Sequence, residues 1–238
     1  MLNDSLLQVF MDGFYGYGNL KAKYWFVGME EGGGQTIEEI TARLETWDQH
    51  GRPVLDDLRR FHHDARLYDW FRKASPLQKT WRALILTVLA AEDGDTTATS
   101  LVEYQRTQLG KAGGETALIE TLPLPSPGTQ TWNYAKWSRL AVLRDRKTYQ
   151  TAYFERRRDR VIDLVRAANP LAVIFYGNSQ DWSKRFGLKA VPPYRIDAAD
   201  CGDSLIIATD HPGARTNDAP ARFEAIGKLI ADKRKPAA

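Results

Sequence analysis

The stretch YWFVGMEEGGG, residues 24–34, decides the fold, because an apolar run of the kind found in buried strands breaks directly into two carboxylates and three glycines. Continuous apolar character from Tyr24 to Val27 is typical of a parallel strand that is covered on both faces. In open α/β sheets, ligands bind beyond the carboxyl ends of such strands. We therefore expect Glu30 and Glu31 to lie at a binding site.

Composition indicates one globular domain that spans residues 1–238, with 43% hydrophobic and 26% charged residues. The single Cys201 can form neither an internal disulfide nor a multi-cysteine metal site. No signal peptide or apolar run of membrane length is apparent, so we expect a cytoplasmic protein that does not contact a membrane. A net charge of +3 is compatible with an anionic partner.

The rest of the chain predicts alternating strands and helices. Further buried strands are expected at 116–122, 171–176 and 204–208, with an edge strand at 194–197. Thr36 and Glu39 form a capping box that starts a helix, and other helices are expected at 54–72, 77–89 and 220–230. The mixture of glycines and aromatic residues before Tyr24 predicts a loop. The expected fold is a three-layer α/β/α domain with a mainly parallel, four-stranded sheet.

Each expected buried strand ends in a polar or glycine-rich segment: GMEEGGG, ETLPLPSP, YGNSQDW and TDHPGARTND. Gly28-Met29-Glu30-Glu31-Gly32 resembles the first motif of the uracil-DNA glycosylase superfamily, Gly-x-Asp/Asn/Glu-Pro-Gly/Tyr. His211-Pro212-Gly213 resembles its second motif, His-Pro-Ser, and residues 175–179 (FYGNS) are similar to the turn after its third strand. In this chain Glu31 replaces the proline of the first motif, and Gly213 replaces the small hydroxyl residue of the second.

The resemblance implies a monofunctional glycosylase that removes uracil from single- or double-stranded DNA. It implies that Glu30 orients water and stabilises the sugar cation, and that His211 hydrogen-bonds the uracil carbonyl. No cofactor or metal is implied, since one cysteine cannot hold the iron-sulfur cluster of some branches. We expect a monomer. Substrate contacts are expected from Gly28, Met29, Glu31, Asn178 and Gly213, and the base edge would be read by Thr121 or Asn133.

The chemistry of N-glycosidic bond cleavage requires the same types of residue, an anion and a hydrogen-bond donor. Breaking an N-glycosidic bond builds positive charge on the sugar and negative charge on the departing base. A site therefore needs an anion near the sugar and a hydrogen-bond donor near the base. Glu30 and His211 supply these two groups. The adjacent His62 and His63 point to different faces of the expected helix, so we do not expect them to share a metal.

A basic stretch between Lys136 and Arg166 contains ten Lys or Arg residues and four acidic residues. Such an excess is typical either of a solvated helix face or of a surface that contacts DNA phosphates. On the second interpretation Arg156, Arg157 and Arg158 bind DNA. The resemblance also implies that Arg215, two residues after the HPG turn, enters the duplex and holds the flipped base out.

Two other functions remain open at this stage. One is a nucleic-acid or nucleotide-binding protein of the same fold without catalytic activity, which fits the absence of an obvious uracil-reading Asn. The other is a hydrolase that acts on free nucleosides. Cleavage of a uracil-containing oligonucleotide separates these possibilities from a glycosylase.

Overall fold

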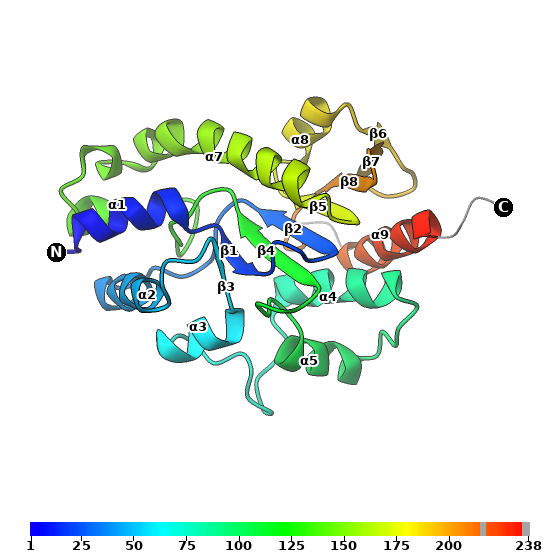
Figure 1. Ribbon diagram of the computed structural model, residues 1–238, viewed down its shortest axis with the longest axis horizontal. Helices are drawn as coiled ribbons and strands as arrows, with labels where there is room; N and C mark the ends of the chain where they lie inside the picture. Colours follow the sequence, from blue (N-terminus) through cyan, green and yellow to red (C-terminus); the bar gives the residue numbers. More distant parts are fainter. Residues whose placement is uncertain (215–217, 235–238) are drawn as a thin grey trace.

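The computed structural model describes residues 1–214 and 218–234, and its centre is one mixed sheet with helices packed on both faces (Figure 1). Within the described residues the sheet has eight strands in the order β3-β1-β4-β2-β5-β8-β7-β6. The strands are β1 (Gly16–Gly18), β2 (Tyr24–Gly28), β3 (Leu55–Asp56), β4 (Thr116–Glu120), β5 (Ala172–Tyr176), β6 (Lys189–Ala190), β7 (Ile196–Cys201) and β8 (Ser204–Thr209).

The sheet confirms the α/β class but not the predicted four-stranded sheet. The four expected strands β4, β2, β5 and β8 are mutually parallel and lie at its centre. Strand β1 extends one side, antiparallel to β4 and parallel to β3, and β7 and β6 extend the other side in antiparallel pairs. Because the central strands are parallel, their carboxyl ends meet at one edge of the sheet.

Strand β1 lies in the segment that the sequence predicted to be a loop. Gly16 has a φ of +132°, and a Cβ on it would lie 2.0 Å from the carbonyl oxygen of Leu118 in β4. Gly18 is equally crowded against the carbonyl of Thr116, at 2.2 Å. The glycines therefore do not break the chain here. They let the backbone of β1 approach β4 more closely than any other residue would allow.

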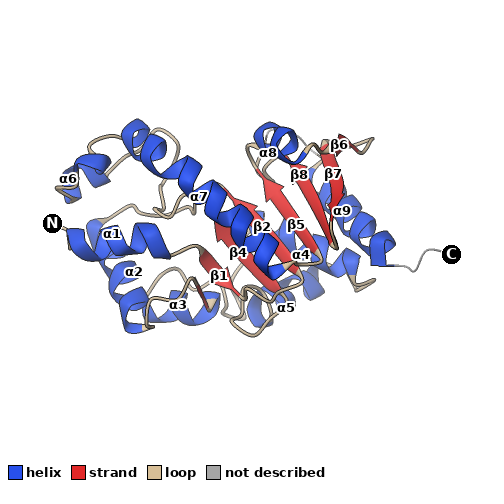
Figure 2. Ribbon diagram, turned by 45° about the horizontal axis from the view of Figure 1, so that its top comes forward, coloured by secondary structure: helices blue, strands red, loops and turns tan. Residues whose placement is uncertain are grey.

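Helices cover both faces of the central strands (Figure 2). Alternate side chains of these strands belong to two core clusters, one on each face. Trp25 and Val27 belong to the cluster that includes residues of α7 (Arg146–Ala168) and α8 (Ser179–Phe186). Tyr24 and Phe26 belong to the cluster on the other face, with α4 (Lys79–Ala91) and α9 (Ala219–Arg234). Both faces of β2 are covered, which explains its unbroken apolar sequence. None of the helices in residues 1–214 and 218–234 is long and apolar enough to cross a membrane.

Helix α1 (Asp4–Gly13) precedes the first strand, and the remaining helical segments lie in the connections between strands. They are α2 (Ile37–Gln49), α3 (Leu58–Asp64), α5 (Ala98–Thr107), α6 (Tyr134–Trp137) and a short 3₁₀ helix, η1 (Ala141–Leu143). The predicted start of α2 is confirmed, because the Thr36 hydroxyl accepts the Glu39 amide at 3.2 Å.

The single helix predicted over residues 54–72 is wrong. Strand β3 occupies its beginning, and Asp57 then caps α3 by accepting the Arg60 amide at 3.0 Å. Helix α3 ends at Asp64, and Arg66 adopts a φ of +52°, which a helix cannot contain. The chain between α3 and α4 is therefore a loop.

Candidate functional site

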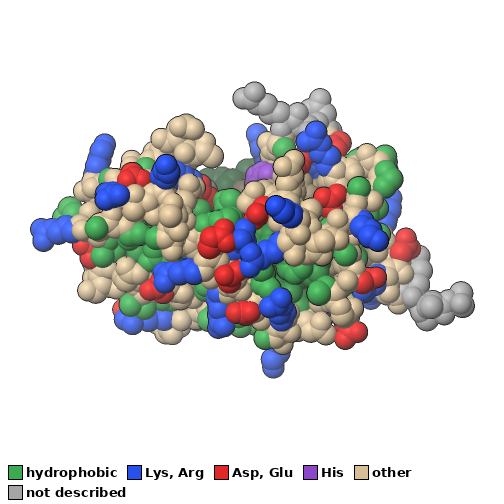
Figure 3. All heavy atoms as spheres, turned by 90° about the horizontal axis from the view of Figure 1, so that it is seen from above, with side chains coloured by type: hydrophobic (Ala, Val, Ile, Leu, Met, Phe, Trp, Pro, Cys, Tyr) green, Lys and Arg blue, Asp and Glu red, His purple; other side chains and the backbone are tan. Residues whose placement is uncertain are grey.

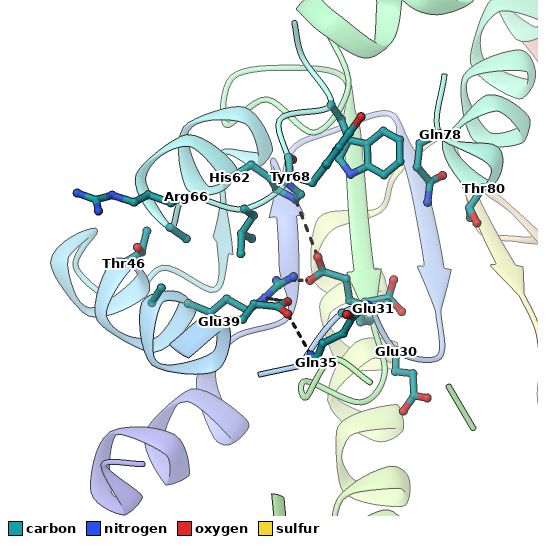
Figure 4. Close-up of a pocket in the computed structure, with 18 of the residues that line it drawn as sticks. Glu30, Glu31, Gln35, Glu39, Thr46, His62, Arg66, Tyr68, Gln78 and Thr80 are labelled. Carbon is teal, nitrogen blue, oxygen red and sulfur yellow. Dashed lines mark hydrogen bonds and ion pairs between the residues drawn. The ribbon is translucent and has the colours of Figure 1, made fainter. Parts of the chain in front are cut away.

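A cleft of about 1330 Å³ opens at the carboxyl edge of the central strands (Figure 4). Its floor is formed by the segment after β2 and by side chains at the ends of β4, β5 and β8, namely Glu120, Tyr176 and His211. Helix α2, the end of α3, the loop that follows it and the start of α4 form the surrounding walls. Glu30 and Glu31, which follow β2, both line this cleft, and their role in binding stays a prediction.

Glu30 points away from Glu31 (Figure 4). It makes an ion pair with Arg146 of α7. Burial raises the pKa of Glu30, and the charge of Arg146 opposes this rise. The second carboxylate oxygen, Oε2, is buried and has no hydrogen-bond partner among the described residues. Arg146 also donates to the Ser126 hydroxyl at 2.9 Å, which fixes the proline-rich loop beside Glu30. Glu30 thus keeps one acceptor atom available.

Glu31 is held by two donors that the sequence did not single out. Its Oε2 accepts hydrogen bonds from the Tyr17 hydroxyl and from Nη1 of Arg43, each at 3.0 Å. Arg43 is 5% exposed and also donates to Glu39 at 3.1 Å, so two carboxylates compensate one buried guanidinium. These charges raise the pKa of Arg43, against its burial. Arg43 was missed because a charged residue in a helix is normally exposed to solvent. In α2 it is instead buried on the apolar face with Ile40 and Leu44.

Glu120 is a second functional candidate that the sequence argument passed over in favour of Thr121. Its carboxyl accepts a hydrogen bond from the Tyr176 hydroxyl at 3.4 Å, and its Oε2 is buried without a partner among the described residues. Burial and, secondly, the charge of Glu31 raise the pKa of Glu120 well above 4.5. The raised pKa favours the protonated form of Glu120, which lies near the carboxylate of Glu31. The segment ETLPLPSP contained this information, since Glu120 is the last residue of β4.

His211 has a defined tautomer. Its Nδ1 accepts the amide of Gly213 at 2.9 Å, so the proton of the neutral ring is on Nε2. Although the side chain is exposed at the cleft mouth, surrounding protein atoms lower the pKa of His211. At neutral pH the imidazole is therefore uncharged and presents Nε2–H as a donor. Its ring lies 5.6 Å from that of Tyr176.

The other predicted substrate contacts divide between the cleft and the scaffold. Met29 lines the cleft, whereas Thr121 is buried and its hydroxyl donates to the Gly28 carbonyl at 2.9 Å. The Asn133 amide donates to the Gly34 carbonyl at 3.3 Å. Asn178 is exposed at the start of α8, with a φ of +52°. Thr121 and Asn133 thus fix the strand ends and the glycine loop, and neither of them nor Asn178 is among the residues that line the cleft.

The three arginines of α7 are not a uniform DNA-binding surface. Arg157 is 1% exposed and donates to the carbonyls of Met11, Phe14, Glu120 and Thr121 at 2.7–3.2 Å. The expectation that Arg157 contacts DNA phosphates is therefore wrong, because its guanidinium is sealed inside the protein.

The charges of its neighbours are also compensated. Arg158 is buried and pairs with Glu155 and Asp181, and the exposed Arg156 pairs with Asp12. Figure 3, which looks onto α7 and α8, shows basic and acidic side chains interspersed over this face. Arg215, the expected wedge, lies outside the described residues. The surface around α7 therefore carries less free positive charge than the sequence suggested.

Metal binding has no support in the described part of the chain, where no group of three or more His, Cys, Asp or Glu side chains is arranged to hold an ion. A search against protein-family models and a search of curated proteins both found no match to this chain. The function is therefore inferred from the residues of the cleft.

Proposed function

We propose that the protein hydrolyses the N-glycosidic bond of uracil in DNA and leaves an abasic site. The observation that carries this proposal is the neutral His211 ring, whose Nε2–H is available as a donor because Nδ1 accepts the Gly213 amide. A departing uracil gains negative charge on a carbonyl oxygen, and a preorganised neutral donor stabilises that charge in the transition state. The resemblance of the first and last strand ends to the uracil-DNA glycosylase superfamily supports the same reaction.

The carboxylates after β2 supply the complementary charge. Glu30 and Glu31 line the same cleft as His211, and each has an oxygen that makes no hydrogen bond to the described residues. An oxocarbenium-like sugar between the strand ends would be stabilised by this negative charge. The size of the cleft, about 1330 Å³, is sufficient for a flipped nucleotide. DNA is the proposed partner.

A second candidate, hydrolysis of free nucleosides, is favoured by the charge of the cleft. The described lining includes seven carboxyl side chains but two arginines, Arg43 and Arg66. An excess of carboxylates repels a phosphate backbone, whereas an uncharged nucleoside is not affected in this way. The acidic lining residues are Glu30, Glu31, Glu38, Glu39, Glu45, Asp64 and Glu120.

One experiment separates the candidates. Protein purified from a host that lacks uracil-DNA glycosylase is incubated with an end-labelled single-stranded oligonucleotide that contains one uracil, and then with alkali. In parallel, release of free uracil from deoxyuridine and uridine is measured by chromatography. Cleavage at the uracil supports the proposal, and release from nucleosides alone supports the second candidate. Retardation of the oligonucleotide without cleavage would identify a binding protein.

The His211→Ala variant, prepared in the same way, controls for contaminating activity. If stoichiometric wild-type protein leaves uracil, xanthine and thymine-mismatch oligonucleotides intact and releases no base from nucleosides, the proposal of an N-glycosyl hydrolase is wrong.

A further inference from the structure

His62 is a buried imidazole with one unused nitrogen in the wall of the cleft. It belongs to α3, is 5% exposed, and its Nδ1 lies 3.1 Å from the carbonyl oxygen of Tyr68. Because a carbonyl can only accept a hydrogen bond, Nδ1 carries the proton. Burial lowers the pKa of His62, so the ring is neutral at pH 7. Nε2 is then a buried acceptor, and it has no hydrogen-bond partner among the described residues.

Glu31 faces this nitrogen. Its Oε2 accepts hydrogen bonds from Tyr17 and Arg43. Its Oε1 lies 4.0 Å from His62 Nε2 (Figure 4). Two acceptor atoms at this distance cannot bond each other directly, since hydrogen bonds of this type span about 2.7–3.2 Å. A molecule that donates two hydrogens can satisfy both. At about 2.8 Å from each atom, a water oxygen would see them at roughly a right angle, which suits its two O–H bonds.

We propose that Glu31 Oε1 and His62 Nε2 together bind one water molecule, and that this water attacks the sugar in the proposed reaction. Both O–H bonds point into the protein, so the lone pairs of the oxygen face the cleft that both residues line. The role in catalysis rests on the proposed function, whereas the water site rests on the contacts of the two side chains. It moves the water-orienting role from Glu30, which is turned toward Arg146, to Glu31.

The reaction step balances without another component. The water oxygen forms a bond to the anomeric carbon, and the electron pair of the breaking C–N bond leaves with the base. His62 Nε2 takes a proton from the water, and the resulting imidazolium faces the negative charge of Glu31. The basic group and its carboxylate partner thus act together, as in other general-base pairs. The departing base is stabilised by Nε2–H of His211.

The first test measures which nitrogen of His62 carries the proton, because the water site requires Nε2 to be an acceptor. Long-range ¹H–¹⁵N spectra of histidine-labelled protein should show His62 as the neutral Nδ1–H tautomer, with an Nε2 resonance typical of a hydrogen-bond acceptor. The His62→Phe variant assigns the signal by its loss, and His63→Phe, on the exposed side of the same helix, is the matched control. A doubly protonated His62, or a proton on Nε2, would leave this nitrogen unable to accept a hydrogen bond from the water and would overturn the proposal.

The second test concerns catalysis on the substrate that the wild type cleaves. Single-turnover cleavage should fall by about 10² to 10⁴ in His62→Gly and should recover in part with added imidazole, which replaces a missing base. His63→Gly should retain the wild-type rate with or without imidazole. Equal rates in the two variants would contradict the catalytic role. Wild-type inactivity on both substrate classes would instead contradict the proposed function, while an accepting Nε2 of His62 would still support the water site.

Discussion

Gly28 and Glu120 are paired in the register of β2 and β4, and the missing Cβ of Gly28 lets the Glu120 carboxyl fold over the strand end. A Cβ at Gly28 would lie 2.5 Å from Glu120 Oε2 and 2.6 Å from the Tyr176 hydroxyl oxygen. The first glycine of the GMEEGGG segment is therefore required by the two side chains packed over it. The backbone conformation does not require it, because its φ is not positive.

Gly28→Ala should lower the free energy of unfolding by about 1–3 kcal/mol, the usual range for overpacking a tight site. The change also displaces Glu120 or Tyr176. Gly32→Ala is the matched control, because a Cβ there has no atom within 4 Å and the φ of Gly32 is not positive. Urea unfolding of both variants measures the difference. A Gly28→Ala protein as stable as Gly32→Ala would show that the crowding is relieved without cost.

Glu120 should make stability depend on pH. Its pKa in the folded protein is raised well above 4.5, so the folded state holds this proton where the unfolded state has lost it. The contribution of Glu120 to stability is then full below about pH 4.5 and is lost as pH rises through the folded pKa. Glu120→Gln cannot titrate, so its stability relative to the wild type should increase between pH 5 and pH 8. Parallel pH profiles of the two proteins, measured by urea unfolding, would refute this.

His211→Ala should reduce single-turnover cleavage by about 10² to 10³, the usual effect of losing one donor to a developing anion. Substrate binding should change little, because the donor acts mainly on the departing base. Rapid-quench kinetics at saturating protein measures the effect. An unchanged rate would remove His211 from the mechanism.

Glu30→Gln should reduce the same rate by about 10² to 10⁴, because glutamine keeps the size of the side chain but not the negative charge. It also leaves Arg146 of α7 without its carboxylate, so the unfolding free energy is measured alongside the rate. A slow but stable variant supports the catalytic role. A variant with wild-type rate shows that the Glu30–Arg146 pair is structural.

Arg156 and Arg157 should respond very differently to substitution. Arg157→Leu leaves four buried carbonyls without their donor, and each unsatisfied group costs about 1–3 kcal/mol, so the protein should lose most of its stability. Arg156→Glu breaks one exposed pair with Asp12 and should cost under about 1 kcal/mol. Thermal unfolding compares them. If Arg157→Leu were as stable as Arg156→Glu, the buried hydrogen bonds of Arg157 would make no net contribution to the free energy of unfolding.

The sequence predicted the centre of the sheet because short, continuous apolar runs such as that of β2 are typical of parallel strands buried on both faces. It did not predict β1 and β3, which are two or three residues long and, in β1, rich in glycine. Such short strands form because neighbouring strands pair with them. The residues that decide this pairing lie far apart in the chain, so a local sequence pattern does not show it. The helix expected over 54–72 failed for a different, local reason, since the cap at Asp57 and the positive φ of Arg66 limit it.

The candidate site was only partly predictable. Glu30, Glu31 and His211 were identified because each directly follows a buried strand, and position along such a strand is visible in a sequence. Glu120 ends β4 in the same way but was overlooked beside Thr121. Arg43 and His62 come from helices that contact the cleft only after folding, so their roles depend on packing between distant segments. The basic stretch misled because its acidic partners, such as Asp12, lie far away in the chain.

The burial of Arg157 also bears on how the chain reaches its folded state. Its guanidinium joins carbonyls near residues 11–14 to α7, across 143 to 146 residues of sequence. Contacts of such high sequence separation raise the contact order of the fold, which slows folding. They also tie the first fourteen residues to the centre of the domain, although none of them lines the cleft. Removing these residues would leave the Arg157 guanidinium without two of its acceptors and would expose the face of α7 that they cover. A chain shortened in this way should therefore not fold, instead of losing α1 alone.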